Sequence, residues 1–259
     1  MQRAISLGDV RQPFGQTSVT ILDDFTVTKG VLYDSALPVE QQHEALNMKF
    51  VFEHTTIPVP RVYMVVAAPN FPGEAFIVMD YIHGHRLDHA WPMLSVWSKL
   101  RVAWVLRSYF RQLRSIKLPY TPIPGPLGPV PQLFPEGTIH SLRPKGPFAD
   151  ADALNTFLNE RANGIRGVAI PPEYEKPEPL VFTHADVNMR NVILGYDGRV
   201  WLIDWDWSGF YPRSWEFITM ARQAENHPTR PTPRSWKLCV PFITGPHFKR
   251  YRWNAGFPP

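Results

Sequence analysis

The sequence has a single cysteine and no long apolar run. Cys239 cannot form a disulfide within the chain, and no group of Cys and His residues has the spacing of a zinc site. No apolar run reaches the roughly 18 to 20 residues that a membrane-spanning helix needs. The first residues, with Arg3, Asp9 and Arg11 close together, lack the apolar centre of a signal peptide. These absences predict a cytoplasmic protein with no membrane partner.

The chain also lacks a dense basic run, an internal repeat and a flexible linker. Its net charge of +4 favours anionic partners only weakly, and none of its segments has the basic density that follows a nucleic acid. Hydrophobic residues make up 44% of its 259 residues, which is enough for a sizeable core. We expect one large domain or two closely packed lobes, with no nucleic-acid partner. The oligomeric state is left open.

The N-terminal part shows the order strand, strand, helix, strand. Residues 18–30, SVTILDDFTVTKG, have the pattern of two short strands joined by a turn. Residues 40–54 have helical spacing, and residues 74–82, EAFIVMDYI, form a further apolar strand. The apolar stripe of the helix is expected to consist of Ala45, Met48 and Phe52. This order predicts a small sheet-based lobe.

The remainder of the chain is mostly helical in pattern. Apolar residues recur at steps of three and four and predict a long amphipathic helix that Pro119 ends. The expected buried stripe of this helix consists of Val96, Leu100, Ala103, Leu106, Phe110 and Leu113. Residues 119–147 are rich in Pro and Gly and predict a long ordered loop. Asp150 is expected to cap a further helix, which a left-handed turn at Asn163 and Gly164 closes.

Three polar residues stand between two strand-like segments. Residues 181–194, VFTHADVNMRNVIL, place His184, Asp186 and Asn191 in a short loop, and a third strand pattern, VWLID, ends at Asp204. Phosphoryl transfer from a nucleotide needs such groups, because one carboxylate orients the attacking hydroxyl while an amide and a second carboxylate hold magnesium on the phosphates. An isolated Asp and Asn also suit loop capping. The presence of Asp204 at the end of a further strand favours the phosphoryl-transfer site.

The same segment carries a family resemblance. HADVNMRN followed by LIDWDWSGFYPRSWE is similar to the aminoglycoside phosphotransferase family of the protein-kinase-like fold, and in particular to its fungal members. The resemblance includes TVTKG, HEALNMKFVFEHTTIPVPRV, FIVMDYIHG and the GPF at 146–148, and it covers roughly residues 17–220. It implies a two-lobed α+β fold. A small antiparallel-sheet lobe is expected over residues 1–82 and a larger, mainly helical lobe over residues 83–259.

The resemblance also implies an activity. The chain is expected to be a phosphotransferase that depends on ATP and magnesium and acts on a hydroxyl of a small molecule. Asp186 would be the catalytic base, and His184, in the same catalytic loop, would hold that loop by hydrogen bonds rather than react. Asn191 and Asp204 would be the magnesium ligands.

Four residues of the smaller lobe would bind the nucleotide by the same resemblance. Lys29 would contact the phosphates, and Glu44 on the helix would fix it. The backbone of Asp80 and Ile82 would meet the adenine. Taken alone, Lys29 and Glu44 could equally be an ordinary surface ion pair of little energetic value. The residues do not distinguish ATP from GTP.

One family feature is missing. Ahead of Lys29 the chain has only Gly8 and Gly15, and no GxGxxG loop is present to cover the phosphates. A curtailed first strand and weak ATP binding are therefore left open. Two alternatives follow, a nucleotide-binding or interaction protein whose chemistry has lapsed, and an enzyme that uses the same cleft for other chemistry.

The C-terminal region bears on the acceptor. Between Phe217 and Pro259 the only acid is Glu225. The basic residues there are Arg222, Arg230, Arg234, Lys237, Lys249, Arg250 and Arg252, and the aromatic residues are Trp236, Phe242, Phe248, Tyr251, Trp253 and Phe257. A polycationic aminoglycoside needs carboxylates around it, so we expect a neutral, aromatic or acidic acceptor with a free hydroxyl. In the alternative, the basic residues form a solvated outer face. Trp201, Trp205 and Trp207 are expected to pack in the core.

Overall fold

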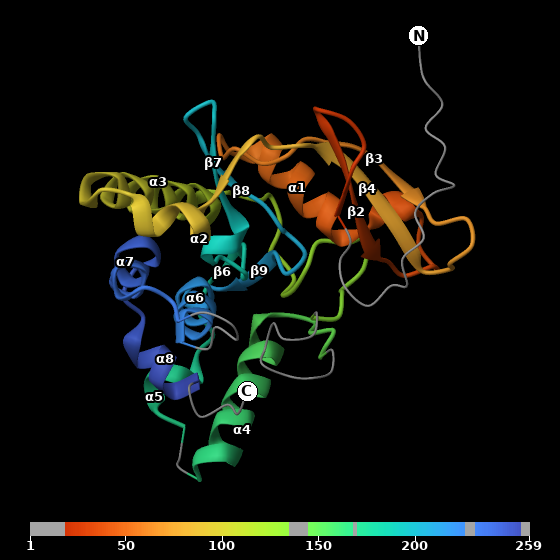
Figure 1. The fold of residues 1–259 in the computed structure, drawn as a ribbon. Helices are drawn as coiled ribbons and strands as arrows, with labels where there is room; N and C mark the ends of the chain where they lie inside the picture. The colour runs from red at the N-terminus through yellow and green to blue at the C-terminus, as the bar shows by residue number, and fades with distance from the viewer. Residues whose placement is uncertain (1–18, 135–144, 168–169, 226–230, 255–259) are drawn as a thin grey trace.

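The computed structural model describes residues 19–134, 145–167, 170–225 and 231–254 (Figure 1). Outside these ranges lie Gly8, Gly15, Arg230, Phe257 and part of the predicted 119–147 loop. Among the described residues, no helix combines the length and the hydropathy that a bilayer crossing requires.

A four-stranded antiparallel sheet with one helix forms the smaller lobe (Figure 1). The strands pair in the order β1-β2-β4-β3. The elements are β1 (Val19–Ile21), β2 (Thr26–Leu32), the short helix η2 (Val39–Gln41), α1 (His43–His54), β3 (Val62–Ala67) and β4 (Glu74–Asp80). Strand β3 was not predicted, because a bulge between Val62 and Met64 breaks the alternation of its side chains. The predicted lobe boundary after residue 82 falls between β4 and β5 and stays a prediction.

Helix α1 packs on the sheet with a stripe that differs from the predicted one. Ala45 and Met48 are buried as expected, but Phe52 is exposed and Val51 takes its place in the core. Glu44 is buried on the same face. At about 100° per residue, positions 44, 48 and 51 lie within roughly 60° of one another, so burying Glu44 turns Phe52 toward the edge.

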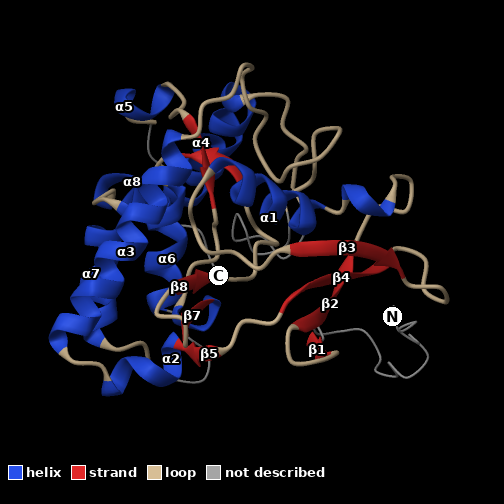
Figure 2. Cartoon of the chain, turned by 90° about the horizontal axis from the view of Figure 1, so that it is seen from above, coloured by secondary structure: helices blue, strands red, loops and turns tan. Residues whose placement is uncertain are grey.

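The larger lobe contains the remaining elements. Helices α3, α6, α7 and α8 gather on one side of the molecule, away from the four-stranded sheet (Figure 2). The helices are α2 (Leu87–Ala90), η3 (Trp91–Met93), α3 (Val96–Ser115), α4 (Ala151–Arg166), α5 (Pro172–Glu175), η4 (Met189–Asn191), α6 (Trp215–Glu225), α7 (Arg234–Thr244) and α8 (Phe248–Asn254). The strands are β5 (Gly84–Arg86), β6 (Leu180–Thr183), β7 (Val192–Gly195), β8 (Val200–Leu202) and β9 (Gly209–Pro212). They form two small antiparallel sheets, β5-β7-β8 and β6-β9.

The long helix α3 forms where it was predicted, but its buried stripe is shorter. Its buried apolar residues are Val102, Ala103, Leu106, Tyr109, Phe110 and Leu113. Val96 and Leu100, which were expected on this stripe, are exposed. They lie roughly 100° around the helix axis from the centre of the buried face, because apolar steps of three and four drift around a helix of 3.6 residues per turn. The first turns of α3 therefore present apolar side chains to solvent.

Helix α4 begins as predicted and ends later. The side chain of Asp150 accepts a hydrogen bond from the amide of Ala153 at 2.8 Å, which confirms the N-cap. The left-handed residue that ends the helix is Gly167, with φ of 64°, and not Gly164. Before α4, the described parts of the predicted loop, 119–134 and 145–147, contain no helix and only isolated bridges.

Candidate active site

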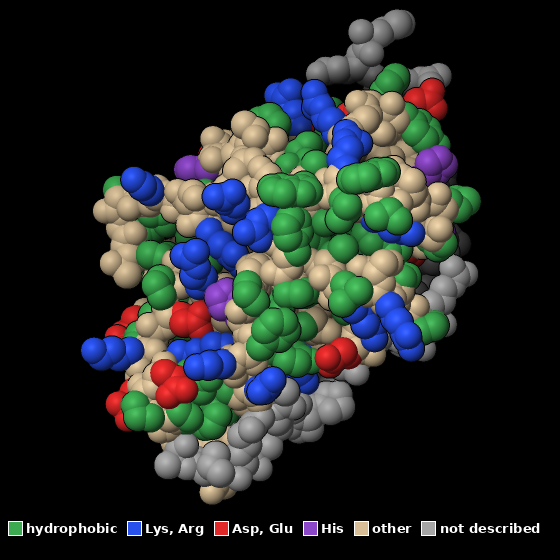
Figure 3. Space-filling view, turned by 90° about the vertical axis from the view of Figure 1, so that its left-hand side faces the viewer, with side chains coloured by type: hydrophobic (Ala, Val, Ile, Leu, Met, Phe, Trp, Pro, Cys, Tyr) green, Lys and Arg blue, Asp and Glu red, His purple; other side chains and the backbone are tan. Residues whose placement is uncertain are grey.

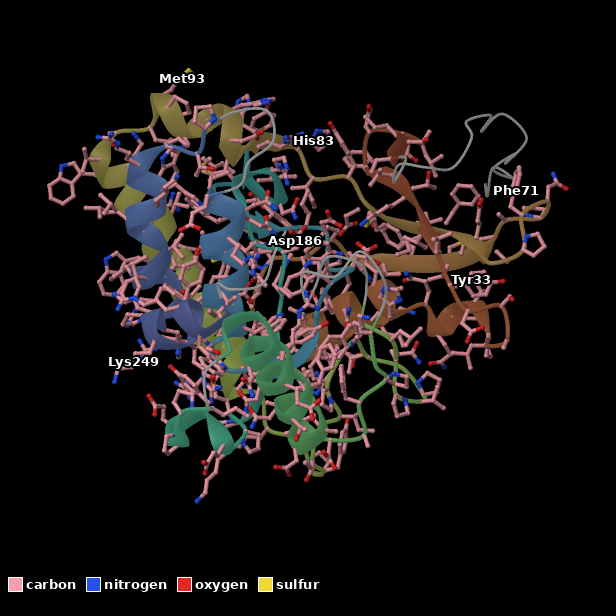
Figure 4. All side chains as sticks on the ribbon, turned by 90° about the horizontal axis from the view of Figure 1, so that it is seen from below. Tyr33, Phe71, His83, Met93, Asp186 and Lys249 are labelled. Carbon is pink, nitrogen blue, oxygen red and sulfur yellow. The ribbon has the colours of Figure 1, made fainter. Side chains whose placement is uncertain are left out.

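The loop between β6 and β7 holds Asp186 at the centre of the molecule, between the two lobes (Figure 4). The side-chain amide of Asn191 donates to Asp186 Oδ2 at 2.7 Å and to its backbone carbonyl at 2.9 Å. Asn188 Nδ2 donates to the same carbonyl at 3.1 Å. The five-residue spacing noted in the sequence thus lets Asn191 fold back on Asp186.

A residue from another helix completes the hold on Asp186. Gln223 of α6 donates its side-chain amide to Asp186 Oδ1. Burial raises the pKa of Asp186 to about 6, and the nearby charge of Asp204 acts in the same direction. No motif in the sequence pointed to Gln223, because it reaches the loop only through the packing of α6. The carboxylate is therefore fixed in direction and is a stronger proton acceptor than an exposed Asp.

His184 lies in the core and not at the surface of the site. Its Nε2 atom lies 3.1 Å from the carbonyl oxygen of Ile203, and its Nδ1 atom accepts from the amide of Asp186 at 3.3 Å. The ring rests on Trp205, with 4.4 Å between the ring centres. Burial lowers the pKa of His184 to about 4, so the ring is neutral. This geometry fits the predicted role of holding the loop.

Lys29 connects the two lobes. Its Nζ atom lies 2.7 Å from Glu44 Oε1 on α1 and 2.6 Å from Asp204 Oδ1 in the larger lobe. Lys29 is only 5% exposed, so it does not form an ordinary surface ion pair. Burial alone would lower the pKa of Lys29, but the two carboxylates raise it above its ordinary value. A permanent positive charge therefore sits between the lobes.

Asp204 has an unusual backbone conformation. It follows β8 with φ of 68°, in the left-handed region that Asp and Asn tolerate better than most residues. The amide of Ile203, the preceding residue, donates to the carbonyl of Asn191 at 3.1 Å, so the two predicted magnesium ligands lie on neighbouring segments. The Asp204 side chain is 40% exposed. One carboxylate and one amide oxygen fit magnesium, which completes its octahedral shell with water and phosphate oxygens.

Helix α1 is attached to the segment after Asp204 by further polar contacts. His43 Nε2 lies 2.8 Å from Asp206 Oδ1. The side-chain amide of Asn47 donates to the carbonyls of Trp205 and Ser208, each at 2.9 Å. No sequence pattern pointed to these pairs, which are about 160 residues apart along the chain. They fix the helix that positions Glu44 against the segment that carries Asp204.

The connection after β4 contains the residues expected to meet adenine. The amide of Tyr81 donates to the carbonyl of Phe25 at 2.8 Å, while the amide of Ile82 has no partner among the described residues. The side chain of Asp80 accepts from the amide of Arg61 at 2.9 Å. A cavity of about 460 Å³ borders this connection, and neither Lys29 nor Asp204 lines it.

A second cavity, of about 320 Å³, opens beside Asp186. Its large apolar lining residues are Met189, Trp207, Met220 and Trp236, and its charged ones besides Asp186 are Asp88 and Arg190. Trp207 was expected to be a packing residue. The C-terminal region contributes Met220, Gln223, Ala224, Thr232 and Trp236, and none of its basic side chains among the described residues. This lining favours the alternative in which these basic residues form a solvated outer face.

A buried carboxylate that had no sequence signal binds backbone amides of the loop that carries Asp186. Glu216 of α6 is 2% exposed, and its Oε2 atom accepts from the amides of His184 at 2.8 Å and Ala185 at 3.4 Å. Burial raises the pKa of Glu216 to about 7. Ala185 has φ of 64°, so these hydrogen bonds stabilise a conformation that a non-glycine residue rarely adopts.

The raised pKa of Glu216 predicts a pH dependence of stability. In the unfolded chain this carboxyl ionises near its ordinary pKa of 4.5, and in the folded protein near 7. Its contribution to the free energy of unfolding is thus fully present below pH 4.5 and is lost as the pH rises through about 7. The Gln side chain does not ionise. The free energy of unfolding of Glu216→Gln, relative to that of the wild type, should therefore rise by up to about 3 kcal/mol between pH 4.5 and 7. Denaturant titrations at several pH values measure the gain, with the exposed Glu175→Gln as control. A difference that is constant with pH would contradict the assignment.

The fold is similar to that of several solved structures. The streptomycin–ATP complex of APH(2")-IIa superposes with a TM-score of 0.56 at 14% identity, over 95% of this chain and 79% of that one. The GDP complex of aminoglycoside 2'-phosphotransferase-IIIa gives 0.57 at 11% identity, over 95% and 80%. ADP-bound APH(2'')-Ib gives 0.54 at 14% identity, over 95% and 79%. These likenesses confirm the two-lobed, kinase-like α+β fold.

The family of the chain follows from its amino-acid sequence. No curated protein sequence matches the chain. A profile described as the phosphotransferase enzyme family matches residues 32–235, a range that includes Asp186, Asn191 and Asp204 and begins just after Lys29. Because this match spans well over half of the chain, the protein belongs to the phosphotransferase enzyme family.

Proposed function

We propose that this protein transfers the γ-phosphate of ATP to a hydroxyl group of a small molecule, with magnesium as cofactor. One observation carries the proposal. Asp186 faces a cavity of about 320 Å³, and the Lys29–Glu44–Asp204 contacts join the lobes beside its loop. The similar structures include ATP, ADP and GDP complexes, which supports a nucleotide as donor.

Lys29 would act on the nucleotide as a fixed cation. Its ammonium is held by Glu44 and Asp204, so little freedom is lost when it contacts phosphate oxygens. The amide of Ile82 and the carbonyl of Asp80 would meet the adenine at the other end of the nucleotide. Asn191 and Asp204 would hold magnesium, which neutralises charge on the phosphates when it is bound.

Asp186 would act on the acceptor. The hydroxyl of the acceptor donates its proton to the Asp186 carboxylate as its oxygen forms a bond to the γ-phosphorus, and the bond from that phosphorus to the ADP oxygen breaks. Asn191 and Gln223 hold the carboxylate in the direction of the cavity. Glu216 and His184 hold the loop by accepting hydrogen bonds from its backbone amides. Asp186 therefore does not need to reorganise during the transfer.

The acceptor would be a neutral or singly charged molecule with an apolar face. Two Trp and two Met side chains line the cavity beside Asp186. Its only other carboxylate among the described lining residues is Asp88, which is already bound by Arg86 at 2.7 Å. Arg190 adds a cation to the same wall. Such a lining offers little compensation for the several ammonium groups of an aminoglycoside.

Thermal stabilisation by ATP tests the nucleotide part of this proposal. A ligand at about 100 times its Kd stabilises the folded state by about 2.7 kcal/mol. For a chain of this size we expect ATP with magnesium to raise Tm by roughly 5 to 10 °C, and ATP with a chelator to raise it less. No shift at millimolar nucleotide would contradict the function. A shift without ADP release on any acceptor would favour the nucleotide-binding protein without turnover.

ADP release with a panel of acceptors tests the acceptor part. We expect turnover with phenolic or hydroxy-acid compounds and poor turnover with kanamycin, because the lining is apolar. Replacing Trp207 with Ala should raise the KM for the acceptor about tenfold and leave the thermal shift with ATP unchanged. Efficient, saturable turnover of kanamycin would overturn this acceptor class without affecting the nucleotide result.

A further inference from the structure

One outer face of the larger lobe combines exposed apolar side chains with positive charge. Figure 3 shows hydrophobic side chains gathered across the middle of this side of the molecule, with Lys and Arg beside them. We define the α3–α7 face by Met93, Val96, Trp97, Leu100, Trp104 and Leu238, all of which are exposed. Trp97 is 80% exposed and Leu238 77%. Side chains of this size in one area indicate a surface that meets a partner.

The helices of this region are unusually uniform in charge. Helices α3, α7 and α8 together carry ten Lys and Arg residues and no Asp or Glu. The basic residues are Lys99, Arg101, Arg107, Arg111, Arg114, Arg234, Lys237, Lys249, Arg250 and Arg252. The C-terminal ones were considered for an acceptor site, but those in α7 and α8 do not line the cavity beside Asp186. Arg250 forms an ion pair with Glu178 at 2.8 Å, whereas the exposed Arg234 and Lys237 of α7 leave positive charge at the surface for an anionic partner.

The face is continuous from α3 to α7. The rings of Trp104 and Phe242 lie 5.2 Å apart, and the guanidinium of Arg107 lies 4.9 Å from the Phe242 ring centre. Arg107 also donates to the carbonyl of Phe242. The apolar residues are thus held on two packed helices in a fixed arrangement. Glu225 of α6, which lines a hollow together with Lys237 and Leu238, accepts a hydrogen bond from Tyr251.

We propose that the α3–α7 face docks on the surface of a membrane that contains anionic lipids. This peripheral contact differs from the expectation of no membrane partner, which rested on the lack of a membrane-spanning run. Trp97, Trp104 and Leu238 would enter the headgroup region, where the amphipathic indole ring is favoured. The surrounding Lys and Arg would contact anionic headgroups, each adding to the affinity. A second copy of the chain fits less well, because a two-fold contact would oppose two faces of the same positive charge. The proposal does not depend on the transferred phosphate or its acceptor.

Vesicle flotation of the full chain tests this docking. The probes are vesicles of phosphatidylcholine alone and of equimolar phosphatidylcholine and phosphatidylserine. We expect binding to the anionic vesicles only, and weaker binding at high salt. Light scattering of the free protein runs in parallel. Equal binding to both vesicles, binding to neither, or a dimer that the face variants dissociate would each overturn the proposal.

Matched variants assign the binding to this face. Trp97→Ser and Leu238→Ser should each weaken vesicle binding about tenfold or more, since each removes exposed apolar area. Arg234→Glu should weaken it by about fivefold per unit of charge. The controls make the same changes on the smaller lobe, Leu32→Ser and Arg61→Glu, where both residues are exposed. Controls that weaken binding as much as the face variants would overturn the assignment.

Discussion

Replacing Asp186 with Asn is expected to slow phosphate transfer by about 10²- to 10⁴-fold, the usual contribution of a positioned general base. The variant keeps the size of the side chain, and its single amide oxygen can still accept from Asn191. Gln223 can turn its own side-chain oxygen, which is buried without a partner, toward the new amide group. It loses the negative charge that accepts the proton of the acceptor hydroxyl. The change should appear in kcat, while the KM for ATP and the thermal shift with ATP stay close to the wild type.

Single-turnover and steady-state ADP release measure this effect. The control is Asp152→Asn, which makes the same change at an exposed position in the first turn of α4. That variant should have the activity of the wild type. Asp186→Asn with unaltered kcat would remove Asp186 from the mechanism, whereas loss of ATP binding in this variant would mean that Asp186 acts on the nucleotide rather than on the acceptor.

Asp186 and its neighbours in the loop could be predicted because their relation is local. Asp186, Asn191 and the strands on both sides lie within a few residues, so spacing and polarity alone placed them. The structure brings them together through Asn191 folding back on Asp186. Asp204 could be placed at the end of the next strand pattern, whereas Lys29 and Glu44 are far away along the chain and their placement relied on the family resemblance.

The residues that surround this centre could not be predicted. Gln223 and Glu216 are on α6, His43 is on α1, and each meets its partner only because its helix packs against a loop that is distant in the sequence. A polar residue on an amphipathic helix has no local signal that separates such a role from solvent exposure. Their positions follow from tertiary packing, which leaves no local pattern in a single sequence.

Helix α3 shows the same limit from the apolar side. Its periodicity predicted the helix correctly but could not tell which apolar residues have a partner. Ala103 and Leu106 pack in the core, whereas Trp97 and Leu100 do not. A pattern records which residues are apolar, but burial depends on whether another element covers that part of the helix. The same reason explains why the basic C-terminal residues were first considered for the acceptor site.

Replacing Asp204 with Asn is expected to abolish the effect of magnesium on nucleotide affinity. Asn is the suitable replacement because residue 204 has a positive φ, which Asn adopts more readily than Ala does. Lys29 keeps its contact with Glu44 at 2.7 Å, so the two elements of the smaller lobe stay together. The change therefore removes one negative charge with little change in shape.

Calorimetric titration of a non-hydrolysable ATP analogue, with magnesium and with a chelator, measures the result. In the wild type magnesium should tighten binding, because the Asp204 carboxylate is the charged ligand that the protein supplies. In Asp204→Asn the two titrations should agree, and turnover should fall by about 10²-fold or more, since charge stabilisation worth several kcal/mol is lost. Asp34→Asn, a change at an exposed carboxylate after β2, is the control and should keep the magnesium effect. A magnesium effect that survives in Asp204→Asn would show that another group holds the metal, and Asn191 alone, a neutral ligand, could not hold it strongly.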